Sequence, residues 1–446
     1  MLWVLSLTSF LISARTPRPG PVTAEEKRQA VAELAKLLRA RYAIPGMAET
    51  AAKTIETKFA QGAYDAFREA KAFGEAVTSD LRAVTKDKHL LFGISSEPPS
   101  PSAAASSKPS DAEAERAFQR AEIRRGNFGL PRAEVLPGNV GLLEVRRFQA
   151  PDLAGDTVAA AVGFLANVDV VIVDVRNCRG GSAHAMPIFA GYFLSKPTSL
   201  FDMVFRGDNF TERFWTAAWL PGRRLADVPM FILTSGYTFS GAEGFAYRFK
   251  VLKRATIVGE TTGGGANAGG VLDVGPLFKV WMPMGRPVDA DTGTNWEGTG
   301  VEPDIKTPAR EALSVAHIEA LKLLKTKAVS DRDRGRLDGA LERAEAGRQP
   351  VSLSQAMLAR FAGVYGPCRV WVEGGQLRVQ RRNEPPFLLV PLTTVVFVSD
   401  TSDPVRLEFF AGPDGLISKI AFTDEDRLRE EYRRDGRTTL LLDGYR

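Results

Sequence analysis

The alternation of apolar and polar positions divides the chain into a helical beginning, an α/β middle and a β-rich end. Near the start, Thr23 and Glu26 have the spacing of a capping box, in which each side chain bonds the backbone N–H of the other residue. Apolar residues then recur on one helix face, at Val31, Leu34, Leu37, Leu38 and Tyr42. We therefore expect helices to about Leu81, followed by a strand-like segment over residues 87–94.

The middle of the chain carries short, continuously apolar runs separated by stretches of helical length. Runs of this kind are typical of parallel strands that are buried on both faces. The expected strands are residues 139–145, 169–175, 228–234 and 255–259. The expected crossover helices are residues 153–166, 183–194 and 241–252. This alternation predicts an α/β domain.

Composition changes on both sides of this middle part. Residues 96–110 are rich in Pro, Ser and Ala and contain no core-forming residue, which is typical of a solvated linker. Residues 369–380 predict a strand, a Gly-Gly turn and a second strand, so the chain ends in a small β domain. The predicted organisation is a signal peptide (1–14), a helical N-terminal domain (15–95), a linker (96–114), an α/β core (115–308), a helical connector (309–350) and a C-terminal β domain (351–446).

Composition and charge exclude several classes of protein. The chain is 44% hydrophobic and 25% charged, which is ordinary for a globular protein, and its net charge is +5. Its arginines are spread as pairs without a long basic block, so we expect no nucleic-acid partner. The three histidines and two cysteines show no metal-ligand spacing, and we expect no metal and no cofactor. Cys178 and Cys368 are expected to be free, buried thiols.

The first residues predict export. Residues 2–12 form an apolar run with the length of a signal-peptide core, and this run is too short to span a bilayer. No Lys or Arg precedes it, which leaves an anchored start as an alternative. We expect a periplasmic or extracellular protein with no integral membrane domain beyond this segment.

Ser240 is the first candidate for chemistry. It follows a predicted buried strand and a tight turn, at the start of a predicted helix. Unpaired N–H groups and the positive end of the helix dipole stabilise an alkoxide or an oxyanion there. Serine is also a favoured N-cap residue, so its position alone is explained equally well by capping.

Glycines follow another predicted strand at Gly180-Gly181. A backbone without side chains can approach a ligand closely and present N–H groups to negative charge. Together with the N–H of Gly241, this segment can form an oxyanion hole beside Ser240. As an isolated motif, a Gly-Gly pair at a strand end is usually only a turn.

The residues alone do not assign a function to two further loops or choose among the histidines. The glycine-rich segment 259–270 lacks the Gly-Lys-Ser/Thr ending of a P-loop, so we interpret it as the lining of a cleft. Residues 295–304 predict an acidic surface loop. A serine nucleophile needs a base, and spacing does not choose among His89, His184 and His317.

Several of these segments resemble the tail-specific, or C-terminal processing, peptidase family, in the branch related to interphotoreceptor retinoid-binding protein. The similar segments are Asp87-Lys-His89, FGLPRAEVLPGNVGLLEVRRF, VIVDVRNCRGG, LTSGYTFSGAEGFAY, RATIVGETTGGGANAG and WEGTGVEPDI. They cover roughly residues 25–95 and 125–306 and occur in the family's order. The resemblance implies a serine peptidase acting on a polypeptide substrate, with a ClpP/crotonase-like core.

The resemblance also implies roles for single residues. Ser240 matches the nucleophile, and Gly181 and Gly241 match the two backbone donors of the oxyanion hole. One branch of the family uses a lysine base in a Gly-Glu-x-Thr-x-Gly-Lys-Gly loop, and Gly265 stands at that lysine position here.

The other branch of the family uses serine, histidine and glutamate, and His89 and Glu297 match its histidine and glutamate. The resemblance therefore implies a Ser240-His89-Glu297 triad. Glu297 would orient the imidazole of His89 and stabilise its charged form. Residues between His89 and Gly138 leave no room for the PDZ domain of processing peptidases, so the resemblance does not supply a cleavage specificity.

Two other functions compete with the peptidase. The related branch includes a carrier, so the main alternative is a non-catalytic binder of retinoid-like or other hydrophobic ligands. A binder has no physical need for Ser, His and Glu together. A crotonase-type acyl-CoA enzyme on the same fold is the third interpretation, and the export signal argues against it.

Overall fold

The computed structural model describes residues 21–94, 109–206, 210–348, 350–401, 405–424 and 428–434. The chain divides into two compact units. Unit 1 consists of residues up to 134, 142–167 and 171–312, and unit 2 consists of residues 135–141, 168–170 and 313 onward. The predicted signal peptide, residues 1–14, lies outside the described residues, as do residues 96–108 of the predicted linker.

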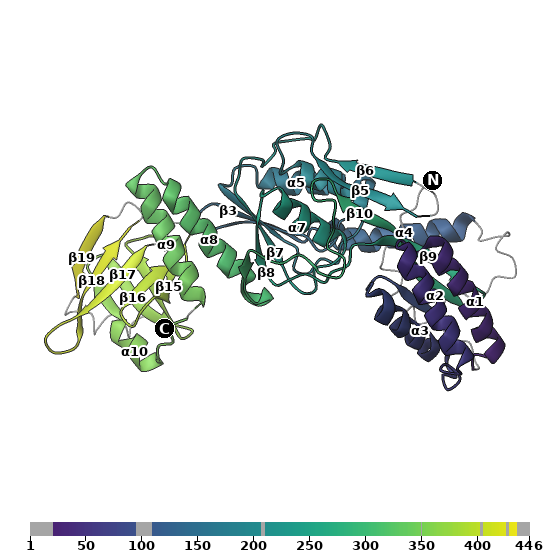
Figure 1. Cartoon of the computed structure of the whole chain (residues 1–446). Helices are drawn as coiled ribbons and strands as arrows, with labels where there is room; N and C mark the ends of the chain where they lie inside the picture. Colours follow the sequence, from purple (N-terminus) through teal and green to yellow (C-terminus); the bar gives the residue numbers. More distant parts are fainter. Residues whose placement is uncertain are drawn as a thin grey trace. The chain divides into compact units, whose positions relative to one another are not determined.

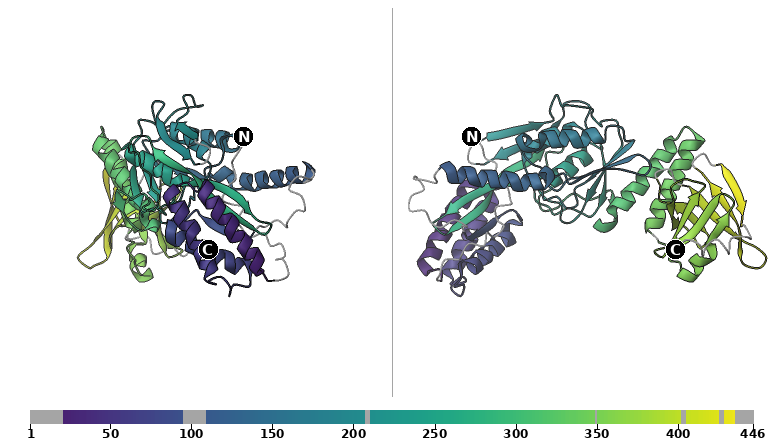
Figure 2. Two further views of the ribbon diagram at one scale, coloured as in Figure 1. Left: turned by 45° about the vertical axis from the view of Figure 1, so that its right-hand side comes forward. Right: turned by 180° about the vertical axis from the view of Figure 1, so that it is seen from behind.

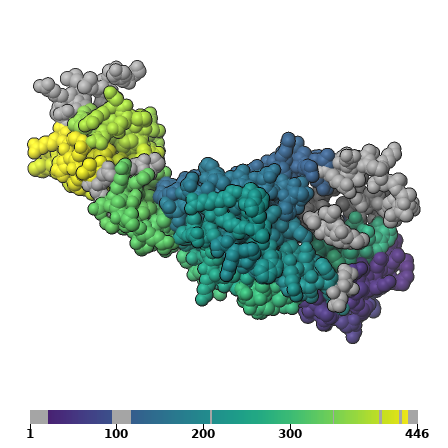
Figure 3. Space-filling view, turned by 90° about the horizontal axis from the view of Figure 1, so that it is seen from above, coloured from purple at the N-terminus to yellow at the C-terminus, as the bar shows by residue number. Residues whose placement is uncertain are grey.

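Three helices form the beginning of unit 1 and are drawn in purple to dark blue in Figure 1, and Figure 3 shows the surface of this part in the same colours. They are α1 (Ala24–Arg41), α2 (Pro45–Ala60) and α3 (Ala70–Thr85). The predicted capping box is present, because Thr23 N–H bonds Glu26 and Glu26 N–H bonds the Thr23 hydroxyl. The apolar face of α1, with Leu34 and Leu38 fully buried, contributes to a core that also includes Phe278 and Val280 of a sheet.

That sheet is antiparallel, and of its strands only the one within residues 87–94 was predicted from the sequence. Its order is β1-β10-β5-β6, with β9 also paired to β10. The strands are β1 (Leu91–Ile94), β5 (Ser199–Phe205), β6 (Phe210–Trp215), β9 (Ala268–Val274) and β10 (Phe278–Asp289). Because β1 follows α3 directly and pairs with β10, the sheet fixes the turn between α3 and β1 against the rest of unit 1.

The second sheet contains the predicted buried strands. Its order is β11-β8-β7-β4-β3-β2, and β4, β7, β8 and β11 pair in parallel. The strands are β2 (Arg132–Leu136), β3 (Val140–Glu144), β4 (Val170–Asp174), β7 (Met230–Thr234), β8 (Thr256–Gly259) and β11 (Ile305–Lys306). The helices between them are α5 (Pro151–Phe164), α6 (Met186–Gly191) and α7 (Gly241–Val251). The mixed α/β character predicted for the middle of the chain is confirmed.

One predicted boundary is wrong. The linker was expected to extend from residue 96 to residue 114, but helix α4 (Pro109–Arg125) already begins at Pro109. Proline is well tolerated in the first turn of a helix, where its missing N–H has no helical partner in any case. The Pro/Ser/Ala-rich composition therefore led to a linker being predicted where the helix begins.

Unit 2 contains helices and an antiparallel barrel, shown from two further directions in Figure 2. Its helical part holds α8 (Ala312–Lys327), which starts at the end of unit 1, α9 (Asp331–Arg348) and α10 (Gln355–Phe361). Eight strands follow in sequence order. They are β12 (Gly363–Tyr365), β13 (Cys368–Glu373), β14 (Gln376–Arg381), β15 (Phe387–Pro391), β16 (Val396–Ser399), β17 (Arg406–Ala411), β18 (Ile417–Thr423) and β19 (Arg429–Arg433).

The barrel closes and is filled by side chains. Tyr365 of β12 pairs with Arg434, directly after β19, so the first and last strands meet. Phe361 of α10 packs against the rings of Phe397 and Phe409 inside the barrel. Cys368 is buried in the same core and Cys178 is buried in unit 1, and both are free thiols as predicted.

A buried arginine fastens helix α7 to strand β10. Arg248 is 3% exposed, and its guanidinium contacts the carboxylate of Asp289 at 3.1 Å and that of Asp291 at 2.7 Å. It also donates to the carbonyl oxygen of Ser199 over 2.6 Å. Helix α7 is therefore held in place at the end opposite to Ser240.

We predict that Arg248→Met lowers the free energy of unfolding of unit 1 by about 3 kcal/mol, because it leaves the buried Asp289 carboxylate without its cation. Urea denaturation followed by tryptophan fluorescence measures the effect. Arg213→Ala is the control, since its 3.6 Å ion pair with Asp202 is exposed and should contribute less than about 1 kcal/mol. Equal losses in the two variants would contradict an anchoring role for Arg248.

Candidate active site

Ser240 begins helix α7 at the end of the tight turn after β7. Its backbone has φ 54° and ψ −123°. Residues with side chains rarely adopt positive φ, and holding one there costs about 1–3 kcal/mol. Ser240 is partly exposed, whereas Phe239 before it is buried. The turn thus presents a serine at a helix N-terminus, where N–H groups and the helix dipole favour negative charge.

Hydrogen bonds fasten this turn to the segment that follows β4. The Thr238 hydroxyl donates over 2.9 Å to the carbonyl oxygen one residue after β4, and the N–H of Phe239 donates over 3.1 Å to Cys178. The hydroxyl of Ser235, the other serine in the turn, donates over 2.6 Å to the carbonyl oxygen of Arg176. Ser235 is therefore used to hold the turn together.

Gly180 and Gly181 lie against the turn because neither carries a side chain. Gly180 has φ +93°, and a Cβ added there would lie 2.6 Å from the backbone nitrogen of Gly241. Gly181 has φ +147°, and a Cβ there would lie 2.1 Å from the carbonyl oxygen of Phe148. The N–H of Phe148 donates to Gly180, and its carbonyl oxygen accepts from Ser182. Larger residues would push these segments apart.

The N–H groups of Gly181 and Gly241 belong to adjacent segments. A Cβ on Gly241 would lie 3.5 Å from the nitrogen of Gly181. In the part of the chain that the structure describes, neither N–H donates a hydrogen bond. Two neighbouring backbone donors beside a serine at a helix start have the chemistry of an oxyanion hole.

His89 lies in the turn between α3 and β1, and Asp87 fixes that turn. One carboxylate oxygen of Asp87 accepts the backbone N–H of His89 over 2.9 Å. The other oxygen accepts from the hydroxyl of Tyr42 over 3.1 Å and from the side-chain amide of Asn267 over 3.0 Å. Asp87 and His89 are 0% and 3% exposed.

The fold brings His89 next to the nucleophile segment. Its imidazole packs on the ring of Phe239 with centroids 4.6 Å apart, and Phe239 directly precedes Ser240. Both imidazole nitrogens are buried, and neither has a hydrogen-bond partner among the described residues. A bond from His89 to Ser240 is therefore not formed, and catalytic hydrogen bonds are often long or unformed in unliganded enzymes.

Gly265 leaves the room that the histidine occupies. A Cβ added at Gly265 would lie 2.2 Å from Phe239 and 2.9 Å from Cε1 of His89. A lysine at this position, which the resemblance places in the other branch, would collide with both rings. The absence of a side chain at Gly265 therefore allows the imidazole of His89 to be buried at this position.

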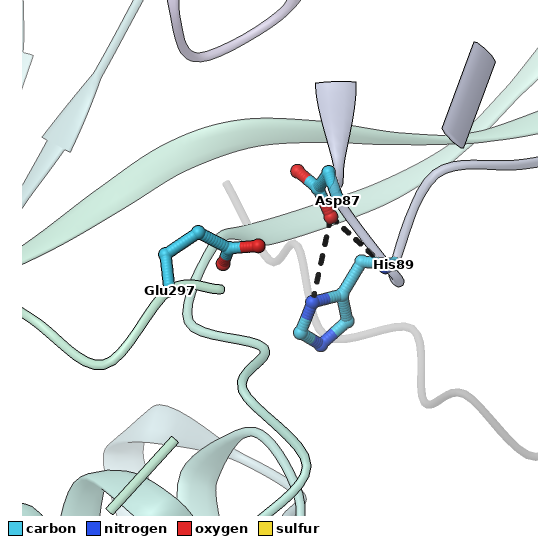
Figure 4. Close-up of side chains that lie close together, drawn as sticks. All are labelled: Asp87, His89 and Glu297. Atoms are coloured by element: carbon cyan, nitrogen blue, oxygen red, sulfur yellow. Dashed lines mark hydrogen bonds and ion pairs between the residues drawn. The ribbon is translucent and has the colours of Figure 1, made fainter. Parts of the chain in front are cut away.

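Glu297 completes the group drawn in Figure 4. One of its carboxylate oxygens accepts the backbone N–H groups of Ala266 at 2.6 Å and Asn267 at 3.0 Å. The other oxygen, Oε1, is buried without a partner among the described residues. One donor atom from each of Asp87, His89 and Glu297 lies within 4.8 Å of the others.

Burial sets the charges of this group. Burial lowers the pKa of His89 to about 4, an effect that Asp87 opposes and that nearby arginines reinforce. Burial raises the pKa of Glu297 to about 7, with a further raising effect from the charge of Asp87. The imidazole is thus neutral at neutral pH, which is the form that accepts a proton from a serine hydroxyl.

Glu243, three residues after Ser240, is a central buried carboxylate that the sequence analysis did not select. It is 0% exposed. One oxygen accepts the N–H of Ser240 over 2.8 Å and the N–H of Gly265 over 2.9 Å. The other accepts the N–H of Gly264 over 2.6 Å and the hydroxyl of Thr262 over 2.5 Å. Burial raises its pKa, and these hydrogen bonds act against that rise.

Family models match two parts of the chain. The model of peptidase family S41 matches residues 139–307, and the model of the N-terminal domain of this family in eukaryotic IRBP, the retinoid-binding protein named above, matches residues 23–123. The chain belongs to peptidase family S41. The predicted family and the prediction of a serine-type peptidase are confirmed.

This S41 peptidase is also similar to several solved structures. The photosystem II D1 C-terminal processing protease is 21% identical, with a TM-score of 0.33, and the match covers 38% of this chain and 43% of that one. A lipoprotein from Streptococcus agalactiae is 17% identical over 71% of this chain and 100% of that one, with a TM-score of 0.43. Mature CPAF is 12% identical over 69% of this chain and 99% of that one, with a TM-score of 0.45.

The other two histidines of this S41 peptidase make different contacts. Nε2 of His184 lies 3.0 Å from a carboxylate oxygen of Glu212, and both side chains are substantially exposed. Nε2 of His317, in unit 2, lies 2.8 Å from the carbonyl oxygen of Pro137. Of the three, His89 is the histidine that contacts the Ser240 turn.

We predict that Glu243→Gln loosens the 262–265 loop, because the amide group of glutamine faces N–H donors that the carboxylate accepted. One lost buried partner corresponds to about 1–3 kcal/mol of stability. Hydrogen exchange measured by mass spectrometry should show faster exchange in peptides covering residues 259–270.

Glu260→Gln is the control on the same loop. Glu260 accepts the N–H groups of Gly236 and Ala309 at exposed positions, where water can replace it. Exchange that is unchanged in Glu243→Gln, or faster only in Glu260→Gln, would contradict the role assigned to Glu243.

Proposed function

We propose that this S41 peptidase hydrolyses peptide bonds with Ser240 as nucleophile, His89 as general base and Glu297 as the residue that orients the imidazole. The N–H groups of Gly181 and Gly241 form the oxyanion hole. The observation that carries the proposal is the meeting of the strained Ser240 turn, two unengaged glycine amides and a buried neutral imidazole within unit 1.

The reaction proceeds by acyl transfer. As the Ser240 oxygen attacks the scissile carbonyl carbon, His89 takes the hydroxyl proton. The oxygen of the tetrahedral intermediate accepts from Gly181 and Gly241. His89 then gives its proton to the leaving amine, and a water molecule activated by the same imidazole releases the acyl group.

The imidazole changes position during this reaction. In the unliganded fold it lies on Phe239, and it turns toward Ser240 when the substrate is bound. Glu297 supports the positive charge that His89 acquires, because its unpartnered Oε1 lies in the same buried group. Asp87 fixes the backbone of His89 and adds a second negative charge nearby.

Export and the ClpP/crotonase-like form of the core are parts of the same proposal. The apolar run at residues 2–12 is the observation that supports a periplasmic or extracellular location. Among the helices of the described residues, none has the length and apolar character needed to cross a bilayer. The carrier alternative is not favoured, since the matched family is a peptidase family.

We predict that a fluorophosphonate probe labels Ser240, and that Ser240→Ala loses both labelling and hydrolysis of casein while its thermal unfolding stays close to that of the parent. Peptide mapping by mass spectrometry locates the label. Ser235→Ala is the matched control, because Ser235 lies in the same turn but bonds Arg176. A label found on Ser235 would overturn the assignment.

We predict that His89→Ala lowers kcat/KM by about 10³-fold or more, as removal of a triad base does, whereas His184→Ala lowers it by less than about tenfold. Glu297→Gln should be intermediate, because it keeps a polar group and loses the charge. Initial rates on casein measure all three variants. A fully active His89→Ala together with an inactive His184→Ala would place the base beside Glu212 instead.

A further inference from the structure

Two segments far apart in the sequence meet at Asp87, His89 and Glu297. Asp87 and His89 come from the turn after α3, and Glu297 comes from the loop between β10 and β11 (Figure 4). Nδ1 of His89 lies 3.9 Å from a carboxylate oxygen of Asp87, and one donor atom of each residue lies within 4.8 Å of the other two. The side chains of Asp87 and His89 are 0% and 1% exposed.

Three polar atoms in this group are buried without a partner among the described residues. They are Nδ1 and Nε2 of His89 and Oε1 of Glu297. A buried polar atom without a hydrogen bond costs about 1–3 kcal/mol, so native proteins contain few of them. Two side chains with such atoms, directed at one another, indicate a group that acquires a partner.

The remaining carboxylate oxygens are already held. The hydroxyl of Tyr42 and the side-chain amide of Asn267 donate to Oδ2 of Asp87. The N–H groups of Ala266 and Asn267 donate to Oε2 of Glu297. Donors of this kind on the far oxygen fix the direction of a metal-ligating carboxylate, as second-shell contacts do in metal sites.

The charge of the group also favours a cation. Two carboxyl groups, those of Asp87 and Glu297, offer ligand atoms within 4.8 Å of each other. A divalent ion between them would balance two carboxylates in a buried position, where unbalanced charge is costly. A neutral imidazole is the form of histidine that binds metals.

We propose that Asp87, His89 and Glu297 bind one divalent transition-metal ion, of which Zn²⁺ is the probe, and that the bound ion holds the enzyme inactive. One imidazole nitrogen and two carboxylate oxygens match the ligands that Zn²⁺ takes, at about 2.0–2.2 Å. Mg²⁺ and Ca²⁺ prefer oxygen ligands only. Small side-chain rotations bring the donor atoms to coordination distance, and water completes the shell.

The inhibitory part rests on the proposed function. An imidazole whose lone pair is bound to a metal ion takes no proton from Ser240, and a coordinated Glu297 does not orient a free imidazole. Binding of the ion and transfer of the proton therefore exclude each other. Removal of the ion restores the base without any change in the fold.

Isothermal titration of tag-free, EDTA-treated protein with ZnCl₂ tests the site without using activity. We expect one Zn²⁺ per chain, and affinity lowered at least about tenfold in His89→Ala and in Glu297→Gln. His184→Ala is the matched control, because His184 and Glu212 form the exposed histidine–carboxylate pair of unit 1. This control should bind like the parent.

Thermal unfolding in the presence of Zn²⁺ gives a second readout, because a ligand of the folded state raises the midpoint of unfolding. The midpoint should rise in the parent and in Ser240→Ala and should rise clearly less in Glu297→Gln, which keeps the shape of the side chain. If His89→Ala does not fold, the Zn²⁺ response of Glu297→Gln alone tests the site. Undiminished binding in both variants, or no binding by the parent at 100-fold excess of Zn²⁺, overturns the proposed site.

Activity separates this inference from the proposed function. Zn²⁺ should stop casein hydrolysis by the parent, and EDTA should restore it. Full activity with one Zn²⁺ bound through His89 overturns the inhibitory role. Zinc binding through His89 by a metal-free parent that hydrolyses no substrate overturns the proposed mechanism instead and leaves the metal site standing.

Discussion

The geometry of the site depends on the buried carboxylate of Glu243. Its two oxygens accept four hydrogen bonds, from the N–H groups of Ser240, Gly264 and Gly265 and from the hydroxyl of Thr262. One bond holds Ser240 in its positive-φ turn, and the other three hold the glycine-rich loop against it. The same carboxylate therefore positions both the nucleophile and the loop whose Gly265 leaves room for the histidine.

Several groups in this site have conformations or surroundings that cost free energy. Ser240 has a strained backbone, two glycine amides have no acceptor among the described residues, and the imidazole of His89 has no partner there either. Proteins tolerate such local violations where function needs them and compensate elsewhere in the fold. Here the compensation is visible in the Arg248 anchor of α7 and in the Asp87 turn.

The sequence was informative where structure is local. The buried runs predicted β3, β4, β7 and β8, because hydrophobic continuity is a property of a few adjacent residues. Strand β10 escaped prediction because Pro283 and Pro287 interrupt its pattern, and proline is usually excluded from paired strands. The meeting of His89 with Glu297 came only from family resemblance, because a contact across 208 residues leaves no trace in spacing. The capping-box spacing of Ser240 and Glu243 could have identified Glu243 from the sequence. Asp87 was part of the segment that resembles the family, but no role was predicted for it.

The pairing of Tyr365 with Arg434 has a consequence for how the C-terminal barrel interacts with other molecules. An open eight-stranded meander would expose two rows of unpaired backbone groups, and such rows recruit strands from other molecules. The bridge between Tyr365 and Arg434 joins these two edges at one point. Arg434, which makes this pairing, is the last residue that the structure describes, so removal of this short stretch would leave the edges of β12 and β19 unjoined and able to recruit strands from other molecules.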